Sequence, residues 1–96
     1  MKIHLTVILK SKKQNVSSLR EALLDLVQKS TQEKACLQYD LHQNKDDETV
    51  FILHETWEDE QGLALHNNQV YLKDFFEHCK VLLDEKPTVF STNHLA

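Results

Sequence analysis

The chain contains only one glycine, one proline and two cysteines among its 96 residues. The single glycine, Gly62, excludes a glycine-rich loop for phosphates or dinucleotides, and no GxSxG, P-loop or HExxH pattern is present. The two cysteines, Cys36 and Cys79, fall in different predicted elements, and we expect both to be free thiols in the core. Without glycine-rich loops or metal-ligand spacing, we expect the protein to work with no flavin, haem or metal.

The charge balance is acidic and the apolar runs are short. The net charge is −4 with His neutral, which gives no basic surface for nucleic acid or for an anionic membrane. No apolar run approaches the roughly 20 residues of a membrane span. The first residues follow a strand-like pattern with no signal peptide before them, so we expect a cytoplasmic protein with neither nucleic-acid nor membrane partners.

Length and composition are those of one small soluble domain, which we expect to span residues 1–96. Apolar residues make up 41% of the chain and charged residues 27%, both ordinary for a globular protein.

The stretch from Cys36 to His66 predicts a β-hairpin followed by a helix. Leu37, Tyr39 and Leu41 alternate with polar residues, as in a half-exposed strand. Residues 50–57 are rich in β-branched and aromatic side chains, and the polar run before them indicates a turn, so the two segments should pair as antiparallel strands. Asp59 is placed to cap the next helix.

The rest of the chain supplies further elements around this hairpin. Alternation over residues 3–10 predicts a first strand, and an apolar stripe from Val16 to Val27 predicts a helix. Ser18 and Glu21 have capping-box spacing, and Asn15 or Ser17 could cap the helix slightly earlier. We expect a short helix over about 59–67, a longer one over about 69–83 and a last strand over 88–93. The order β-α-β-β-α-β, with its second helix split, predicts a ferredoxin-like α+β fold with a four-stranded antiparallel sheet and helices on one face.

Two of the predicted strands carry apolar residues on both faces. Leu5 and Val7 alternate with Ile8 in the first strand, and Leu53 alternates with Ile52 in the third. A sheet covered on one side only should not show this pattern. We therefore expect a homodimer in which a second copy covers the open face, although ordinary variation in strand facing would give the same pattern.

The chain also resembles a known family. The pattern Glu33-x-Ala-Cys-Leu-x-Tyr39, then Phe51-x-Leu-x-Glu-x-Trp57-x-Asp, Leu63-x-x-His66 and Phe75-Phe76 is similar to that of the antibiotic biosynthesis monooxygenase superfamily. The resemblance implies a small dimeric α/β barrel. It is compatible with cofactor-independent quinol or anthrone monooxygenases, with haem-degrading enzymes and with an isomerase of a phosphorylated autoinducer. The family usually has Gly where this chain has Ala35, which would strain the local turn if that position needs a positive φ.

His66 is the first candidate for chemistry. It lies three residues after Leu63 on the predicted helix, so both side chains should face the sheet. A His facing an apolar pocket can act as a base toward a phenol or quinol, or it can be a core residue bonded to a backbone carbonyl. Asn67, which follows, could orient a substrate oxygen or cap the helix end.

Further candidates would line a substrate pocket. His4 points away from its apolar neighbours and either lines the pocket, as the resemblance implies, or faces solvent. Trp57 either packs a helix on the sheet or touches substrate, and Glu55 on the same face should pair with an Arg, a Lys or a backbone amide. Tyr71, Phe75 and Phe76 form an aromatic stripe that is either core or the wall of a site for a flat aromatic substrate. The six His show no i, i+3 or i, i+4 pair, so we expect no metal site.

Three functions follow from these features. The first is a cofactor-independent monooxygenase that oxidises a small quinol or phenol with O₂. The second is an isomerase or another non-redox enzyme for a small polar metabolite, which a pocket holding Lys, Asp and His together would favour. The third is a non-catalytic dimeric ligand-binding module, whose pocket would be filled by side chains and would have no polar group directed into it.

Overall fold

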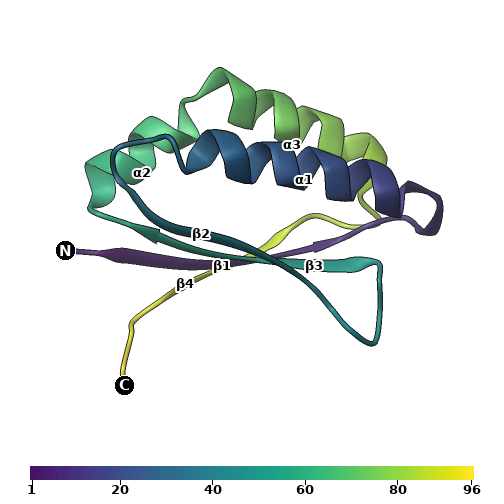
Figure 1. Cartoon of the computed structure of the whole chain (residues 1–96), viewed down its shortest axis with the longest axis horizontal. Helices are drawn as coiled ribbons and strands as arrows, with labels where there is room; N and C mark the ends of the chain where they lie inside the picture. The colour runs from purple at the N-terminus through teal and green to yellow at the C-terminus, as the bar shows by residue number, and fades with distance from the viewer.

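The structure is a computed structural model that describes residues 1–96, and it confirms the ferredoxin-like α+β fold. A four-stranded antiparallel sheet carries all of the helices on one face (Figure 1). The elements in chain order are β1 Ile3–Lys10, η1 Lys13–Asn15, α1 Val16–Ser30, β2 Cys36–Gln43, β3 Val50–Trp57, α2 Glu60–Asn67, α3 Val70–Leu82 and β4 Thr88–Thr92. No helix is long and apolar enough to cross a membrane.

The strands are arranged in the order β2-β3-β1-β4. In β1, Leu5 lies opposite Glu55 of β3 and Ser91 of β4, and Glu55 in turn lies opposite Tyr39 of β2. Residues that lie directly opposite each other on neighbouring strands point to the same face of the sheet. These side chains therefore share the face that the helices cover. The register is irregular between Cys36 and Gln38, and Leu37 at that point stays 50% exposed instead of joining the core.

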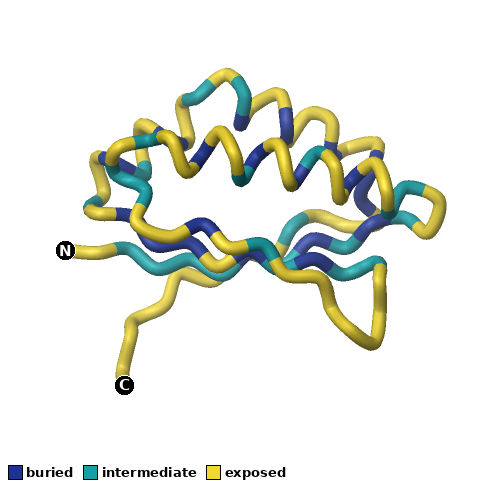
Figure 2. Tube along the Cα trace, viewed as in Figure 1, coloured by how far each residue is buried: buried dark blue, intermediate teal, exposed yellow.

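The core lies between this inner face of the sheet and the helices (Figure 2). The fully buried side chains come from every layer and include Leu9, Leu19, Leu23, Phe51 and Trp57. Burying a large aliphatic or aromatic side chain stabilises a fold by about 1.5–3 kcal/mol. This packing fixes α1 and α3 over the sheet and so positions every residue that faces the layer between them.

The start of α1 lies at the earlier alternative, Asn15, and not at the capping box of Ser18 and Glu21. The helix begins at Val16, after the short turn η1, and its N-cap Asn15 makes no side-chain cap hydrogen bond. The Asn15 amide instead donates to the carbonyl of Val81 at the end of α3. A contact distant in sequence thus joins the start of α1 to the end of α3, which a local pattern does not reveal.

The opposite, outer face of the sheet is uncovered (Figures 1 and 2). It carries half-buried or exposed apolar side chains, among them Ile8, Ile52 and Phe90, between polar ones. The Thr56 hydroxyl donates to Gln38 Oε1 at 2.7 Å, so His4 Nδ1, 3.1 Å from that hydroxyl, must be the donor in their bond. His4 thus lies on the outer face, bonded across two strands.

The N-terminus of α2 packs directly on the loop before β2. Asp59 caps the helix as expected and accepts a hydrogen bond from the Gly62 amide at 2.7 Å. No residue has a positive φ, so Ala35 is unstrained despite the family preference for Gly. A Cβ placed on Gly62 would lie 2.3 Å from the Ala35 Cβ. The close approach of α2 to this loop therefore requires glycine at position 62.

We expect Gly62→Ala to destabilise the protein by about 1–3 kcal/mol, the usual effect of overpacking. The Ala35→Gly, Gly62→Ala double variant should recover most of that loss, because it removes the clashing methyl and because Ala favours the helix. Urea denaturation of the two single variants and the double variant measures this coupling. Additive effects would show that the Ala35–Gly62 contact does not limit how α2 packs.

Candidate active site

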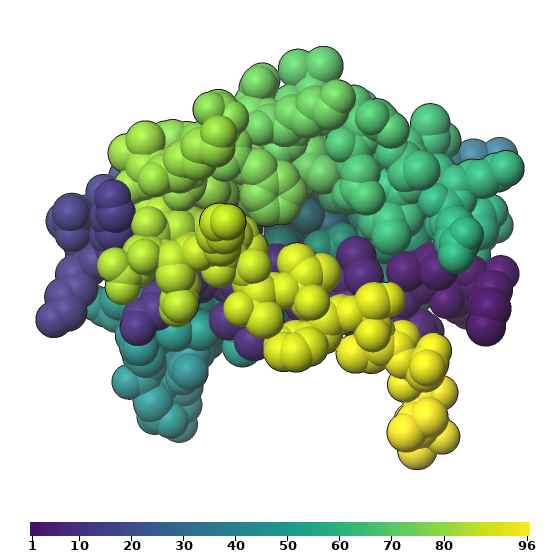
Figure 3. Space-filling view, turned by 180° about the vertical axis from the view of Figure 1, so that it is seen from behind, coloured from purple at the N-terminus to yellow at the C-terminus, as the bar shows by residue number.

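A cavity of about 340 Å³ lies between the inner face of the sheet and the helices. Figure 3 shows the surface hollowed between the side chains of α3 and those of β4. Most of the lining is aliphatic or aromatic and comes from β1, β3, α1, α3 and β4, with Leu5, Leu26, Leu53, Phe75 and Val89 as examples. The polar lining residues are Tyr39, Glu55, His66 and Asn67. An apolar pocket with a few polar groups in it is the usual form of a small-molecule site.

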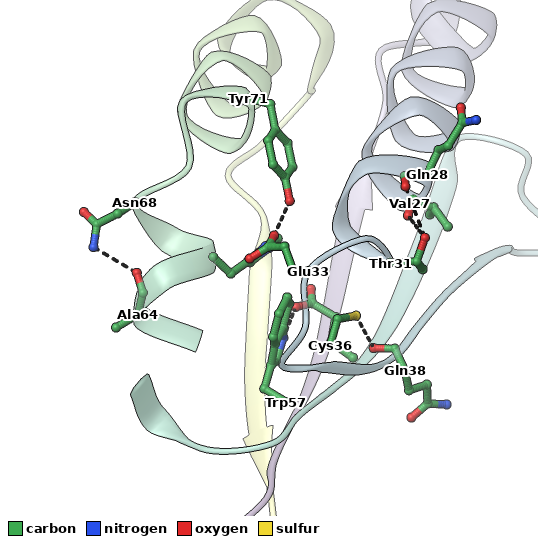
Figure 4. A network of polar contacts seen from close by, with 12 residues as sticks. Val27, Gln28, Thr31, Glu33, Cys36, Gln38, Trp57, Ala64, Asn68 and Tyr71 are labelled. Carbon is green, nitrogen blue, oxygen red and sulfur yellow. Dashed lines mark hydrogen bonds and ion pairs between the residues drawn. The ribbon is translucent and has the colours of Figure 1, made fainter. Parts of the chain in front are cut away.

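His66 is held by a carboxylate from the loop between α1 and β2. Its Nδ1 lies 2.6 Å from Glu33 Oε2, and the hydroxyl of Tyr71 donates to the same oxygen. Figure 4 shows Tyr71 reaching from α3 to Glu33. Because an ionised carboxylate only accepts hydrogen bonds, His66 carries a proton on Nδ1, which leaves Nε2 as the basic nitrogen of the neutral ring. A carboxylate-oriented imidazole of this kind has the form that general bases take in enzymes.

Trp57 connects two of the ionisable groups of the cavity, His66 and Glu55. Its ring lies against the imidazole of His66, with centroids 4.3 Å apart, and its Nε1–H donates to Glu55 Oε1 at 2.9 Å. The partner of Glu55 is therefore the indole two residues along the same strand face, and the expectation of an Arg, a Lys or a backbone amide is wrong. Side chains at i and i+2 of a strand lie next to each other, so the chain satisfies this buried carboxyl locally.

Burial shifts the acidity of several groups in or beside the cavity. Desolvation raises the pKa of Glu55, while the indole N–H of Trp57 and the neighbouring His66 act in the opposite direction. Burial and the charge of Glu55 raise the pKa of Tyr39 above that of a free phenol. Burial likewise raises the pKa of Cys36 to about 11, so this thiol stays protonated and is a poor nucleophile.

The structure distributes the seven sequence-predicted site residues among four places. His66, Asn67, Phe75 and Phe76 line the cavity together. The remaining three, His4, Trp57 and Tyr71, do not: His4 is on the outer face, Trp57 is fully buried behind His66, and Tyr71 lines a separate groove between α1 and α3. Trp57 nevertheless packs against His66 itself, and Tyr71 donates to the Glu33 carboxylate that holds it.

Sequence reasoning assigned no role to Glu33 and Tyr39, although both belong to the site. Tyr39 is 4% exposed and lines the cavity beside Glu55. Glu33 lies in a loop and reaches His66 across 33 residues of chain. An acidic loop residue just before a strand belongs to no periodic pattern that would indicate burial. The one feature of the sequence that could have pointed to Glu33 was its place in the family pattern. No group of three or more His, Cys, Asp or Glu side chains is arranged to hold a metal ion.

The chain matches a known family model and a curated relative. Residues 3–78 match the model described as "Antibiotic biosynthesis monooxygenase". The Bacillus subtilis (strain 168) protein "Putative monooxygenase YcnE" is 34% identical over 67 residues, which cover 70% of each chain.

Solved structures share the fold over nearly the whole chain. PA3566 from Pseudomonas aeruginosa superposes with a TM-score of 0.92 and 29% identity, covering 99% of this chain and 95% of that one. Rv0793 from Mycobacterium tuberculosis superposes with a TM-score of 0.93 and 19% identity, covering 100% and 97%. At that identity the second likeness extends to the fold alone.

Proposed function

Since this chain belongs to the antibiotic biosynthesis monooxygenase family, we propose that it is a cofactor-independent monooxygenase that oxidises a small quinol or related phenol with O₂. The observation that carries the proposal is the His66 imidazole, held by Glu33 at the wall of an otherwise largely apolar cavity. The reaction is quinol plus O₂ giving hydroxyquinone plus water.

The side chains contribute proton removal, orientation and exclusion of water. His66 Nε2 takes the proton of a substrate hydroxyl, and the resulting imidazolium is stabilised by the Glu33 carboxylate and by the face of Trp57. The apolar lining removes the hydration of the phenolate, which makes it a better electron donor to O₂. One electron passes to O₂, and the two radicals combine at a ring carbon, so the oxidant and the substrate account for every electron transferred.

The cavity also fits the size of such a substrate. A volume of about 340 Å³ accommodates a compact aromatic molecule, since ligand sites usually span about 300–1,000 Å³. Phe75 and Phe76 wall the cavity from α3, and Asn67 lies beside His66, where its amide can orient a second substrate oxygen.

The test is turnover of a panel of quinols and phenols under air and under nitrogen. The proposal predicts oxygen uptake stoichiometric with substrate loss under air and no reaction under nitrogen. Equal turnover without O₂ would contradict an oxygenase, and no turnover of any quinol or phenol would contradict the substrate class.

A second candidate, a non-redox enzyme such as an isomerase, has one observation in its favour. The groove between α1 and α3 brings Asp25, Lys29, Asp74 and His78 together, which is the combination that an isomerase of a polar metabolite would need. All four are exposed, and Lys29 pairs with Asp25 at 2.9 Å on the helix surface, a contact of little energetic weight. The cavity with a carboxylate-held His is the stronger site.

The cavity argues against a purely non-catalytic binding module. Such a module would have its pocket filled by side chains and no polar group directed into it. Here the space is open, and His66 and Glu55 both line it.

The proposal includes a homodimer in which a second copy covers the outer face of the sheet. The support is the apolar content of that face, with Phe90 at 51% exposure. The β2–β3 loop and the C-terminal segment also both extend to this side and flank it (Figures 1 and 3). Two sheets that pack face to face bury such side chains between them.

We expect Ile52→Lys to convert the dimer into a monomer or an aggregate, because the substitution places a charge on the outer face between β1 and β2. Light scattering after gel filtration at micromolar concentration measures the mass. Lys80→Met on the exposed surface of α3 is the matched control and should remain dimeric. A wild-type protein of 11.2 kDa in solution would contradict the dimer directly.

A further inference from the structure

Glu55 is a second ionisable side chain in the same cavity as His66, and the mechanism above gives it no task. It extends from β3 at the inner face of the sheet and is 6% exposed. Its Oε1 accepts the hydrogen bond from the Trp57 indole, whereas Oε2 has no hydrogen-bond partner in the chain. Oε2 is not among the fully enclosed unpaired polar atoms, of which Ser30 Oγ is the single case. The free carboxyl oxygen is therefore accessible from the cavity.

A buried carboxyl with a free oxygen needs an explanation, because an unpaired polar group in an apolar site destabilises the fold. A purely structural role as acceptor for the indole would be served equally by an amide. The carboxyl differs from an amide in its ability to give and take a proton at Oε2, beside a substrate that also contacts His66.

After the substrate hydroxyl is deprotonated, the oxygenation requires two further proton transfers, which a single His66 would have to perform one after the other. After O₂ adds, the ring carbon carries a peroxide anion and its original hydrogen. The peroxide must gain a proton, and the ring carbon must then lose its hydrogen as the O–O bond breaks. At that stage His66 already holds the proton of the substrate hydroxyl.

We propose that Glu55 is the second proton-transfer group of this site: its neutral form protonates the ring peroxide, and the carboxylate that results removes the ring hydrogen. The C–H electron pair becomes the new C=O bond, and the O–O pair leaves with the distal oxygen. That oxygen leaves as water after it takes the proton held by His66. Both side chains return to their starting states, and quinol plus O₂ gives hydroxyquinone plus water. This inference rests on the proposed function.

The surroundings of Glu55 keep a neutral carboxyl available. Its pKa is raised, chiefly by burial. The ionisable groups around it are His66 from α2 and Tyr39 and Cys36 from β2, with the Trp57 N–H as the one direct hydrogen bond. The residues that α1, α3 and β4 contribute to the cavity are all apolar. No cation other than protonated His66 lies in the cavity to hold the carboxyl in its ionised form.

Glu55→Gln is the sharpest variant, because glutamine keeps the volume and the oxygen that accepts from Trp57 but cannot transfer a proton. We expect turnover to fall about 10²- to 10⁴-fold, with the melting temperature at pH 8 unchanged or raised. The sign follows from the raised pKa of Glu55: the folded state holds this proton more tightly than the unfolded state. The carboxyl therefore destabilises the fold increasingly as pH rises above the unfolded value, and the amide removes this effect. Glu58→Gln, the same change at an exposed site, is the control.

The decisive readout is the isotope effect with ring-deuterated quinol. If Glu55 removes the ring hydrogen, that step limits turnover in Glu55→Gln, and the primary isotope effect rises above the wild-type value. Glu55→Asp should recover part of the rate, because it restores a carboxyl. An unchanged rate and isotope effect in Glu55→Gln, while the wild-type protein oxidises quinol, would overturn the role of Glu55 alone. A wild-type protein that oxidises no quinol would overturn the proposed function and this inference together.

Discussion

Replacing His66 by alanine is expected to lower quinol-dependent oxygen uptake about 10²- to 10⁴-fold, the usual effect of losing a general base. The substitution removes the basic Nε2 from the cavity wall and leaves the Glu33 carboxylate with Tyr71 as its one remaining donor. Because His66 is 2% exposed and hydrogen-bonded, stability should also fall, by about 1–3 kcal/mol. Melting temperature alone therefore does not separate a catalytic His66 from a structural one.

A catalytic His66 is distinguished from a structural one by the turnover rate per folded molecule and by chemical rescue. Added imidazole fits the space left by the side chain, and it should restore part of the turnover if a base is what the variant lacks. His78→Ala, on the exposed surface of α3 and at the α1–α3 groove, should keep wild-type turnover. If His78→Ala abolishes activity and His66→Ala does not, the groove is the site and the cavity is not.

The second large effect is expected at Glu33, which orients His66 without lining the cavity. Glu33→Gln removes a charge-assisted hydrogen bond of about 1.5–3 kcal/mol. Since 1.36 kcal/mol corresponds to tenfold in rate, kcat should fall by about 10- to 150-fold with KM little changed. Tyr71→Phe is the matched control: it removes one donor to Glu33 and leaves the Glu33–His66 bond in place, so its effect should be the smaller.

The effect of Glu33 on the tautomer of the His66 ring can be measured independently of activity. Nitrogen NMR of the His66 ring should show the Nδ1–H tautomer in the wild-type protein and a mixture of tautomers in Glu33→Gln. A pure Nδ1–H signal in Glu33→Gln, or equal kcat for this variant and the wild type, would show that the carboxylate does not position the base.

The fold was predictable because its signals are local and periodic. Alternation over β1 and over the β2–β3 hairpin, and the apolar stripe of α1, each depend on neighbours two to four residues apart. The Asp59 cap is equally local, and it is confirmed at 2.7 Å. The start of α1 at Val16, after Asn15, was among the local alternatives, whereas the contact of Asn15 with Val81 spans 66 residues and has no local signal.

The candidate site was predictable only in part, because its contacts join residues that are far apart in the sequence. His66 could be placed on a helix face directed at the sheet, and the structure brings it to the cavity with Phe75 and Phe76. Its partner Glu33 is 33 residues away in a loop, and Tyr71 reaches the same carboxylate across 38 residues. Such contacts follow from how α2 and α3 pack, which no pattern along the chain specifies.

The most direct test of the central claim, that the cavity of His66 is a quinol oxygenase site, is turnover under ¹⁸O₂ with mass analysis of the product. The account predicts one labelled oxygen atom in each hydroxyquinone and the other in water, with no label in the product of His66→Ala beyond the uncatalysed background. Product that forms without label, or label incorporated equally by wild type and His66→Ala, would contradict it.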